Sequence, residues 1–321
     1  MRAENTLYVV VPCYREEEVL PETSKRLKAK LSALIAQGKI SPRSRILFVN
    51  DGSKDRTWPI IEELHARDRI FSGVNLSRNR GHQNALLAGL MTAVQHADMM
   101  VSMDADLQDD VDAMDRMIDA YHEGYDVVYG VRSSRKTDSF FKRFTAESFY
   151  RLMKAMGVNI VFNHADYRLM SRRAVEGLSQ FREVNLFLRG IVPQIGYSWT
   201  TVEYERARRF AGESKYPLKK MLSFALDGIT SFSIKPLRLI LALGVVIFAL
   251  SLVMLLWTLV RWIAGATVSG WTSLMCSIWM IGGIQLLALG VIGEYIGKVY
   301  GETKARPRFI IERVLNDKDN D

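Results

Sequence analysis

The stretch Met99-Met100-Val101-Ser102-Met103-Asp104-Ala105-Asp106-Leu107-Gln108 is an uncharged apolar run that ends in two carboxylates and a carboxamide. So short a run predicts a buried parallel strand, whose carboxyl end opens into the crevice where open α/β sheets bind ligands. Mg²⁺ and Mn²⁺ prefer oxygen ligands and often join protein carboxylates to substrate phosphates. We therefore expect a metal–diphosphate site here; for this motif taken alone, the alternative is a solvated acidic turn.

Predicted strands and helices alternate on either side of this stretch. Besides the strand that ends at Asp104, the pattern predicts strands at residues 7–11, 45–49, 73–76 and 126–129. Helices are predicted at 20–37, up to about 67, from 85 onward, and at 111–123, 140–156 and 172–181. Polar residues follow each strand, so the alternation predicts a doubly wound, mainly parallel α/β sheet with one site along its carboxyl edge.

Two common phosphate-binding motifs are absent from the sequence. No Gly-x-Gly-x-x-Gly follows the first predicted strand, and Gly-x-x-x-x-Gly-Lys-Ser/Thr occurs nowhere. A nucleotide would therefore be held by side chains and a metal rather than by a glycine-rich loop.

Two long segments near the carboxyl end, residues 239–260 and 262–293, contain no charged residue. Each exceeds the roughly 20 residues that a helix needs to cross a membrane, which predicts two transmembrane helices; the alternative is a buried hairpin of a soluble protein. Basic residues flank the pair on the outside, whereas Arg261 alone lies between the two segments. The positive-inside rule then places both termini in the cytoplasm, and we expect no secretory signal before the first strand.

The formal net charge is +8, and a group of the basic residues clusters before the first apolar segment. They are Arg206, Arg208, Arg209, Lys215, Lys219, Lys220, Lys235 and Arg238. Such a juxtamembrane cluster favours anionic lipid and phosphate as partners rather than nucleic acid. The two cysteines, Cys13 and Cys276, lie in different regions, so we expect neither a disulfide nor a zinc site.

These patterns divide the chain into four parts. We expect a sheet domain at residues 1–212, interfacial amphipathic helices at 213–235, a two-helix transmembrane domain at 236–301 and a cytoplasmic tail at 302–321. An ordinary surface helix is the alternative for the amphipathic part. The spacing of Gly293, Gly297 and Gly301 suits close helix packing within or between subunits.

Three motifs follow consecutive predicted strands: Pro12-Cys13-Tyr14-Arg15-Glu16, Asn50-Asp51-Gly52-Ser53 and Asp104-Ala105-Asp106-Leu107-Gln108. In this order they resemble family 2 glycosyltransferases with the GT-A fold. Gly130-Val131-Arg132, Ala165-Asp166-Tyr167-Arg168-Leu169-Met170, Gly212-Glu213-Ser214-Lys215-Tyr216 and the two apolar segments extend the resemblance to polyprenyl-phosphate glycosyltransferases, among them bactoprenol glucosyltransferases and dolichol-phosphate mannose synthases. Those enzymes transfer a sugar, with inversion, from a nucleotide donor to a polyprenyl phosphate at the cytoplasmic face of the membrane.

The resemblance implies a set of donor-side residues. It implies that the nucleotide is bound by Pro12, Tyr14, Glu16, Asp51 and Asp104. It further implies that Asp104, Asp106 and Gln108 hold Mg²⁺ or Mn²⁺ on the donor diphosphate, with Asp106 part of the catalytic machinery. A metal suits this chemistry because it offsets the charge that develops on the leaving nucleoside diphosphate.

On the acceptor side, the resemblance implies contacts to the lipid phosphate from Arg132, Arg135, Arg143, Arg208, Ser214 and Lys215. Asp166 aligns with the position usually proposed as the catalytic base. A phosphate monoester is already largely dianionic at neutral pH, however, so Asp166 has a second possible role, the orientation of donor or acceptor. A structural turn aspartate is the third alternative.

The resemblance favours a bacterial plasma-membrane enzyme that glucosylates undecaprenyl phosphate from UDP-glucose, with UDP-N-acetylglucosamine or GDP-mannose as alternative donors. The family also implies a homo-oligomer, with a tetramer as one form. A processive polysaccharide synthase would carry Gln-x-x-Arg-Trp, whereas the only Arg-Trp here is Arg261-Trp262 at the end of the first apolar segment. A sugar-nucleotide binding membrane protein without catalysis is the remaining alternative.

Overall fold

The computed structural model describes residues 5–132, 164–205, 233, 235–264 and 270–316. The chain divides into two units. The first contains the described residues up to 205 together with 306–316, and the second contains the described residues between 233 and 305. Residues 306–316, which the sequence predicts as part of a tail, thus group with the sheet domain.

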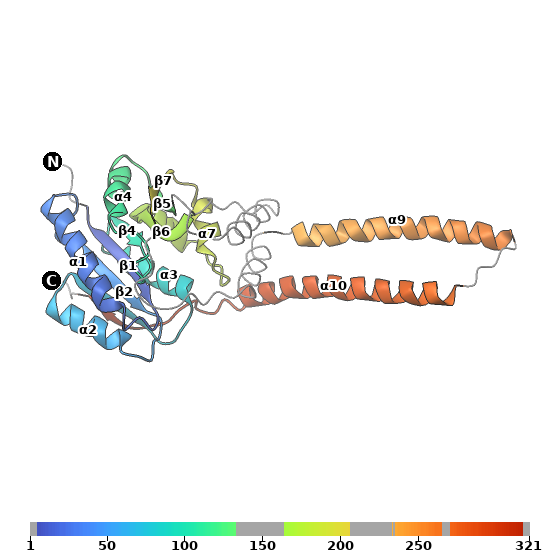
Figure 1. The fold of residues 1–321 in the computed structure, drawn as a ribbon, viewed down its shortest axis with the longest axis horizontal. Helices are drawn as coiled ribbons and strands as arrows, with labels where there is room; N and C mark the ends of the chain where they lie inside the picture. Colours follow the sequence, from blue (N-terminus) through green and yellow to red (C-terminus); the bar gives the residue numbers. More distant parts are fainter. Residues whose placement is uncertain (1–4, 133–163, 206–232, 234, 265–269, 317–321) are drawn as a thin grey trace. The chain divides into compact units, whose positions relative to one another are not determined.

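The first unit is built on one mixed sheet (Figure 1). Its strands are β1 (Leu7–Cys13), β2 (Arg45–Asn50), β3 (Phe71–Leu76), β4 (Met99–Ser102), β5 (Val127–Arg132), β6 (His164–Ser171), β7 (Trp199–Tyr204) and β8 (Ile311–Leu315). Their order is β7-β5-β6-β4-β1-β2-β3-β8. The predicted α/β sheet is confirmed, and the pairs β1/β2, β1/β4, β2/β3 and β5/β7 are parallel. Strands β6, β7 and β8 were not predicted.

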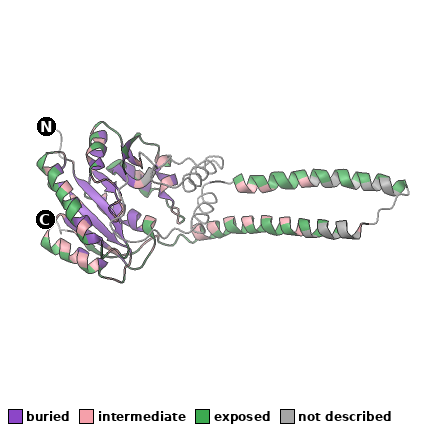
Figure 2. Cartoon of the chain, viewed as in Figure 1, coloured by how far each residue is buried: buried purple, intermediate pink, exposed green. Residues whose placement is uncertain are grey.

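Helices cover both faces of this sheet. The helices are α1 (Leu20–Ala36), α2 (Thr57–Arg67), α3 (His82–Ala93), α4 (Ala113–His122), α6 (Arg172–Ser179) and α7 (Leu188–Ile191), followed by the 3₁₀ helix η1 (Val192–Ile195). Residues of α1, α2 and α4 share one buried core with Leu7, Val9 and Val11 of β1 (Figure 2). Each such buried side chain contributes about 1.5–3 kcal/mol to stability, so this layer holds the parallel strands in register.

Helix α3 approaches the opposite face closely because it has no side chain at Gly89. A Cβ there would lie 2.4 Å from Cγ1 of Val10 and 2.7 Å from Cγ2 of Val49. The close approach fixes the amino end of α3, where His82 stands, against the carboxyl ends of the central strands.

The two antiparallel strands decide which residues reach the carboxyl edge of the sheet. Because β6 runs antiparallel to β4 and β5, its first residues lie beside the last residues of both neighbours; Arg168 is opposite Ser102. Strand β8 is antiparallel to β3 in the same way, and Ile311 is opposite Leu76. The starts of β6 and β8 therefore join the ends of the parallel strands at one edge.

The second unit contains two long helices, α9 (Lys235–Ile263) and α10 (Trp271–Thr303), which contact each other. Much of both helices is exposed (Figure 2). The exposed apolar side chains include Leu239, Leu256, Leu286 and Leu289. Among the described residues, one segment, Met280–Thr303, meets the length and hydropathy expected of a membrane span. The second predicted span stays a prediction, and most of the amphipathic segment predicted at 213–235 lies outside the described residues.

Candidate active site

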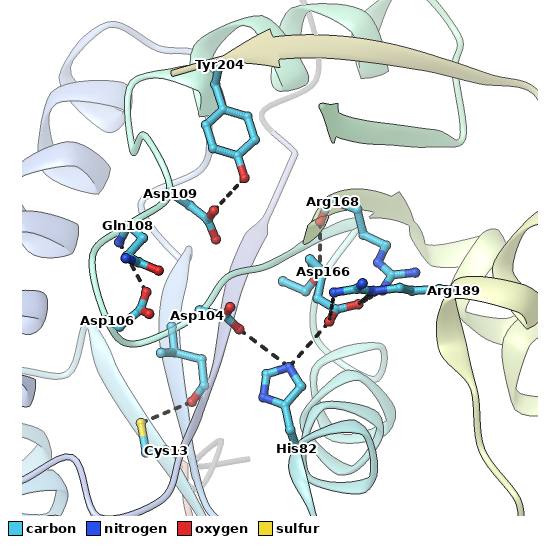
Figure 3. Close-up of polar contacts among 12 residues, drawn as sticks. Cys13, His82, Asp104, Asp106, Gln108, Asp109, Asp166, Arg168, Arg189 and Tyr204 are labelled. Carbon is cyan, nitrogen blue, oxygen red and sulfur yellow. Dashed lines mark hydrogen bonds and ion pairs between the residues drawn. The ribbon is translucent and has the colours of Figure 1, made fainter. Parts of the chain in front are cut away.

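The loop that follows β4 carries the acidic motif. Asp104, Asp106 and Gln108 are half-buried, whereas the residues between and after them, Ala105, Leu107 and Asp109, are buried. Leu107 has a φ of 57°, a left-handed conformation that is uncommon for a leucine. The backbone N–H of Gln108 donates to Oδ1 of Asp106 at 3.2 Å, which ties the Asp106 side chain to the backbone of the loop at Gln108 (Figure 3).

The oxygen donors of this loop suit a hard divalent cation that a substrate completes. Among the described residues, no group of three or more His, Cys, Asp or Glu side chains is arranged to hold a metal by itself. Mg²⁺ commonly binds through one or two carboxylates plus substrate phosphates, so Asp104, Asp106 and Gln108 fit that mode of binding. The pKa of Asp104 is raised by desolvation and by the nearby carboxylates of Asp166 and Asp106, a repulsion that a cation would relieve.

Asp166, near the start of β6, is held by two arginines. Its Oδ1 accepts from Nη2 of Arg168 at 2.8 Å and from Nε of Arg189 at 3.2 Å, and its Oδ2 accepts from Nη2 of Arg189 at 3.0 Å (Figure 3). Burial alone would raise the pKa of Asp166, but the charges of Arg189, Arg168 and His82 outweigh it and hold that pKa well below its usual value. Asp166 is thus an ionised carboxylate that orients guanidinium groups.

His82 lies between the two acidic centres. Its Nε2 is 3.5 Å from Oδ1 of Asp104 and 3.9 Å from Oδ2 of Asp166 (Figure 3). Since His82 is the first residue of α3, its ring also stands at the amino end of that helix. Asp104 and Asp166, which lie far apart in the sequence, therefore face the same imidazole.

The loops after β1 and β2 form the other side of the edge. Pro12 lies within β1, and Tyr14, which follows the strand, is exposed. The backbone N–H of Arg15 donates to Oγ of Ser53 at 3.0 Å, and that of Asp51 donates to the carbonyl of Cys13 at 2.9 Å. The two loops are thus joined, as expected if they bind one ligand.

Asp51 connects these loops to the one after β3. Its Oδ1 accepts from the N–H of Arg80 at 2.7 Å and its Oδ2 from the N–H of Gly81 at 2.9 Å. Desolvation raises the pKa of Asp51, and the two backbone hydrogen bonds oppose that rise. The neighbouring Gly52 has a φ of 62°, and a Cβ there would lie 2.5 Å from the backbone of Arg78.

A buried hydrogen bond links the acidic loop to the end of β7. The Tyr204 hydroxyl donates to Oδ1 of Asp109 at 2.5 Å (Figure 3). Arg132, the register partner of Tyr204, lies close enough to lower the pKa of both groups. Desolvation nevertheless raises the pKa of Asp109 to about 6.

The structure brings most predicted site residues to one edge of the sheet: Pro12, Tyr14, Glu16, Asp51, Asp104, Asp106, Gln108, Arg132 and Asp166. Arg135, Arg143, Arg208, Ser214 and Lys215 lie outside the described residues. Sequence reasoning missed Arg189, Asp109 and Tyr204 and assigned no role to His82. No local signal marks Arg189, a single arginine between apolar residues, whereas Asp109 directly follows the acidic motif.

Comparison with known proteins agrees with this geometry. Residues 8–178 match Glycosyl transferase family 2, and residues 235–299 match the GtrB C-terminal hairpin. The chain therefore belongs to glycosyl transferase family 2. The resemblance inferred from the three strand-end motifs is confirmed.

Curated relatives match nearly the whole chain. "Uncharacterized glycosyltransferase YkoT" of Bacillus subtilis (strain 168) is 51% identical over 97% of this chain and 92% of its own length. "Prophage bactoprenol glucosyl transferase homolog" of Escherichia coli (strain K12) is 41% identical over 95% of this chain and 98% of its own. "Bactoprenol glucosyl transferase" of Shigella phage SfX is 39% identical over 95% of this chain and 98% of its own length.

Proposed function

We propose that this enzyme transfers glucose from UDP-glucose to undecaprenyl phosphate at the cytoplasmic face of the membrane, with a divalent cation and with inversion at the anomeric carbon. One observation carries the proposal. The acidic loop, Asp166 with its two arginines, and Arg132 lie at one edge of the sheet, in a chain that also matches the GtrB hairpin. The bactoprenol glucosyl transferase relatives, similar over their whole length, support the acceptor and the sugar.

On the donor side, Asp104, Asp106 and Gln108 would hold Mg²⁺ or Mn²⁺ against the diphosphate. Bound there, the cation would stabilise the negative charge that builds up on the leaving nucleoside diphosphate. Tyr14, exposed after β1, is available to stack on the base, and Asp51 fixes the backbone of the loops that would surround the ribose. Pro12 and Glu16 would complete this nucleotide site.

Near the reacting carbon, Asp166 would act by holding Arg189 in place rather than by removing a proton. The acceptor phosphate is already largely dianionic at neutral pH, so it attacks without a base. Arg189 is bound through two nitrogens to Asp166, and its guanidinium charge, fixed in this way, would stabilise the nearby phosphate oxygens. A carboxylate held by two guanidinium groups is also a poor nucleophile, which favours direct displacement and therefore inversion.

On the acceptor side, Arg132 at the end of β5 would bind the lipid phosphate, together with Arg135, Arg143, Arg208, Ser214 and Lys215. The topology supports a membrane hairpin before the last strand. Tyr204 of β7 and Ile311 of β8 belong to the same sheet, so a chain that crosses the membrane between them would have to return to the side that it left. Helices α9 and α10 contain 29 and 33 residues. At about 1.5 Å per residue, each exceeds the roughly 30 Å of a hydrocarbon core, which is consistent with two spans.

Membranes containing the protein, incubated with undecaprenyl phosphate and radiolabelled UDP-glucose, test the proposal. We expect a chloroform-soluble labelled lipid that forms with Mg²⁺ or Mn²⁺ and not with excess EDTA. Parallel reactions with UDP-N-acetylglucosamine and GDP-mannose identify the donor. Absence of lipid-linked label with every donor would refute the transferase proposal, and label from one of the other donors would replace glucose.

A further inference from the structure

Strand β8 pairs with the edge of β3 and is also joined to β2 through the side chain of Asn75. Asn75, near the end of β3, is opposite Asn50 of β2 on one side and opposite Arg313 of β8 on the other. The side chain of Asn75 bonds in both directions: its Nδ2 donates to Oε2 of Glu312 at 2.8 Å, and its Oδ1 accepts from Nδ2 of Asn50 at 2.7 Å. Asn75 thus connects the carboxyl-terminal strand to the centre of the sheet.

The connection continues into the loops assigned to the nucleotide. Oδ1 of Asn50, a residue that is 1% exposed, accepts from the backbone N–H of Ser53 at 3.3 Å. Oγ of Ser53 accepts in turn from the backbone N–H of Arg15 at 3.0 Å. An unbroken series of four hydrogen bonds therefore runs from Glu312 to the loop that contains Tyr14 and Glu16.

The direction of this series is fixed at its outer end. A carboxamide offers a donor on one side and an acceptor on the other, and its partners decide which way it points. Glu312 is an acceptor only, so it orients Nδ2 of Asn75 outward and Oδ1 inward, toward Nδ2 of Asn50. Asn50 then presents its own oxygen to Ser53. If the Asn75 carboxamide were turned round, its NH₂ group would face the NH₂ group of Asn50, and the loop that contains Ser53 would be disturbed.

We propose that Asn75 and Glu312 are positioning residues of the nucleotide site, so that the segment after the membrane hairpin forms part of the donor-binding structure. This inference rests on the proposed assignment of the loops after β1 and β2 to the nucleotide. Donor affinity then depends on residues 310–316, although β1, β2 and β3 lie between β8 and the strand that carries the acidic loop. The backbone N–H of Ser77 adds a further bond to this segment, since it donates to the carbonyl of Ile310 at 3.0 Å.

A compensating pair of substitutions tests the direction of the series. Asn75→Asp keeps the oxygen that faces Asn50 but replaces the outward NH₂ by an oxygen that repels Glu312. Adding Glu312→Gln supplies an NH₂ that donates to the new carboxylate and restores the bond with reversed polarity. The loss of one such bond corresponds to roughly a 3- to 10-fold change in affinity. We therefore expect Asn75→Asp to raise the Kd for nucleotide about 3- to 10-fold, and the double variant to return within about 2-fold of wild type.

The measurement is calorimetric titration of the full-length protein in detergent with UDP and with GDP, using the one that the wild type binds more tightly. Glu312→Gln alone retains an acceptor for Asn75 and should bind normally. Arg313→Ala, which removes a contact to exposed Glu62 from the same strand, is the matched control and should also bind normally. In turnover assays, KM for the donor should rise, while KM for the lipid and kcat stay within about 2-fold.

The outcomes separate this inference from the proposed function. An unchanged Kd in Asn75→Asp, or a raised Kd that Glu312→Gln does not restore, overturns the positioning role even if the enzyme is active. If Asn75→Asp does not fold, Glu312→Ala takes its place, because Glu312 is exposed and its backbone pairing is unaffected; a normal Kd there also overturns the role. Wild-type protein that binds neither nucleotide refutes both proposals, whereas nucleotide binding without lipid glycosylation refutes only the transferase.

Discussion

Replacement of Asp166 by asparagine is the most informative single perturbation of this site. The substitution keeps the shape of the side chain but removes the charge that faces Arg168 and Arg189. The Arg168 side chain is 2% exposed, so it would be left as a buried cation without its counter-charge. Removing one partner of a buried ion pair typically costs about 3–5 kcal/mol.

We expect Asp166→Asn to lower the free energy of unfolding by an amount at the lower end of that range. The Arg189 side chain is 32% exposed and can turn toward water, so its share of the loss is small. A destabilisation of about 3 kcal/mol lowers Tm by roughly 6–12 °C in a domain of about 150–250 residues. The loss of guanidinium positioning should also lower kcat, by about 100-fold.

The assay is thermal unfolding followed by intrinsic fluorescence, in detergent with EDTA, compared at pH 6, 7 and 8. The control is Glu22→Gln, which breaks a surface ion pair with Arg26 and should change Tm by at most about 2 °C. The pKa of Asp166 is lowered from 3.8, so the carboxylate contributes its stability above about pH 4 and loses it only as the pH falls through the lowered value. The Tm difference between wild type and variant should therefore be constant from pH 6 to 8.

Two results would refute this reasoning. A Tm of Asp166→Asn equal to that of wild type would mean that the carboxylate does not hold the arginines. A Tm difference, or a kcat ratio, that changes with pH between 6 and 8 and still does so when His82, which faces Asp166, is replaced by Gln would mean that Asp166 itself titrates there, as a general base would.

Three further substitutions test other parts of the edge. Asp106→Asn should abolish most lipid glycosylation at any Mg²⁺ concentration, and full activity would remove the metal assignment. Gly52→Ala should weaken nucleotide binding about 10-fold and lower Tm, because the new Cβ would lie 2.5 Å from the backbone of Arg78. Gly38→Ala is the control, since Gly38 has a similar φ of 67° but nothing within 4 Å of a Cβ. It should cost only the roughly 1 kcal/mol of a left-handed residue and leave nucleotide binding unchanged. Tyr204→Phe leaves the buried carboxylate of Asp109 without its hydroxyl donor and should lower the free energy of unfolding by about 1–3 kcal/mol. Tyr125→Phe, at an exposed position, is the control and should not. Equal Tm values for the two variants would contradict the buried contact.

The parallel part of the sheet and its acidic loop are predictable because their signals are local. Short apolar strands followed by polar loops are visible in the sequence, and parallel strands place their carboxyl ends at one edge by topology alone. Asp51 and Asp104 can therefore be assigned to the same edge from residue order and type. The uncharged segments that supply most of α9 and α10 are equally evident, because the absence of charge is itself a local property.

Strands β6 and β8 were not predictable, since an antiparallel partner is chosen by contacts between distant segments. The Tyr167-Arg168-Leu169-Met170 stretch carries a charge that a buried strand would not be expected to contain, and only pairing with Asp166 makes that charge tolerable. The segment around Glu312 is short and polar, and without β3 beside it nothing identifies it as a strand.

The sequence by itself determined the chemistry that the edge of the sheet can perform, because the carboxylates, the amide and the apolar segments are fixed by residue type and order. The tertiary structure decided how those groups act. It set two arginines against Asp166, which favours the proposed anchoring role of this carboxylate over that of a base, and it brought Glu312 to Asn75 across 237 positions of the chain. The physical reason is the same in both cases: electrostatic and hydrogen-bond partners depend on distance in space, which the order of residues along the chain does not specify.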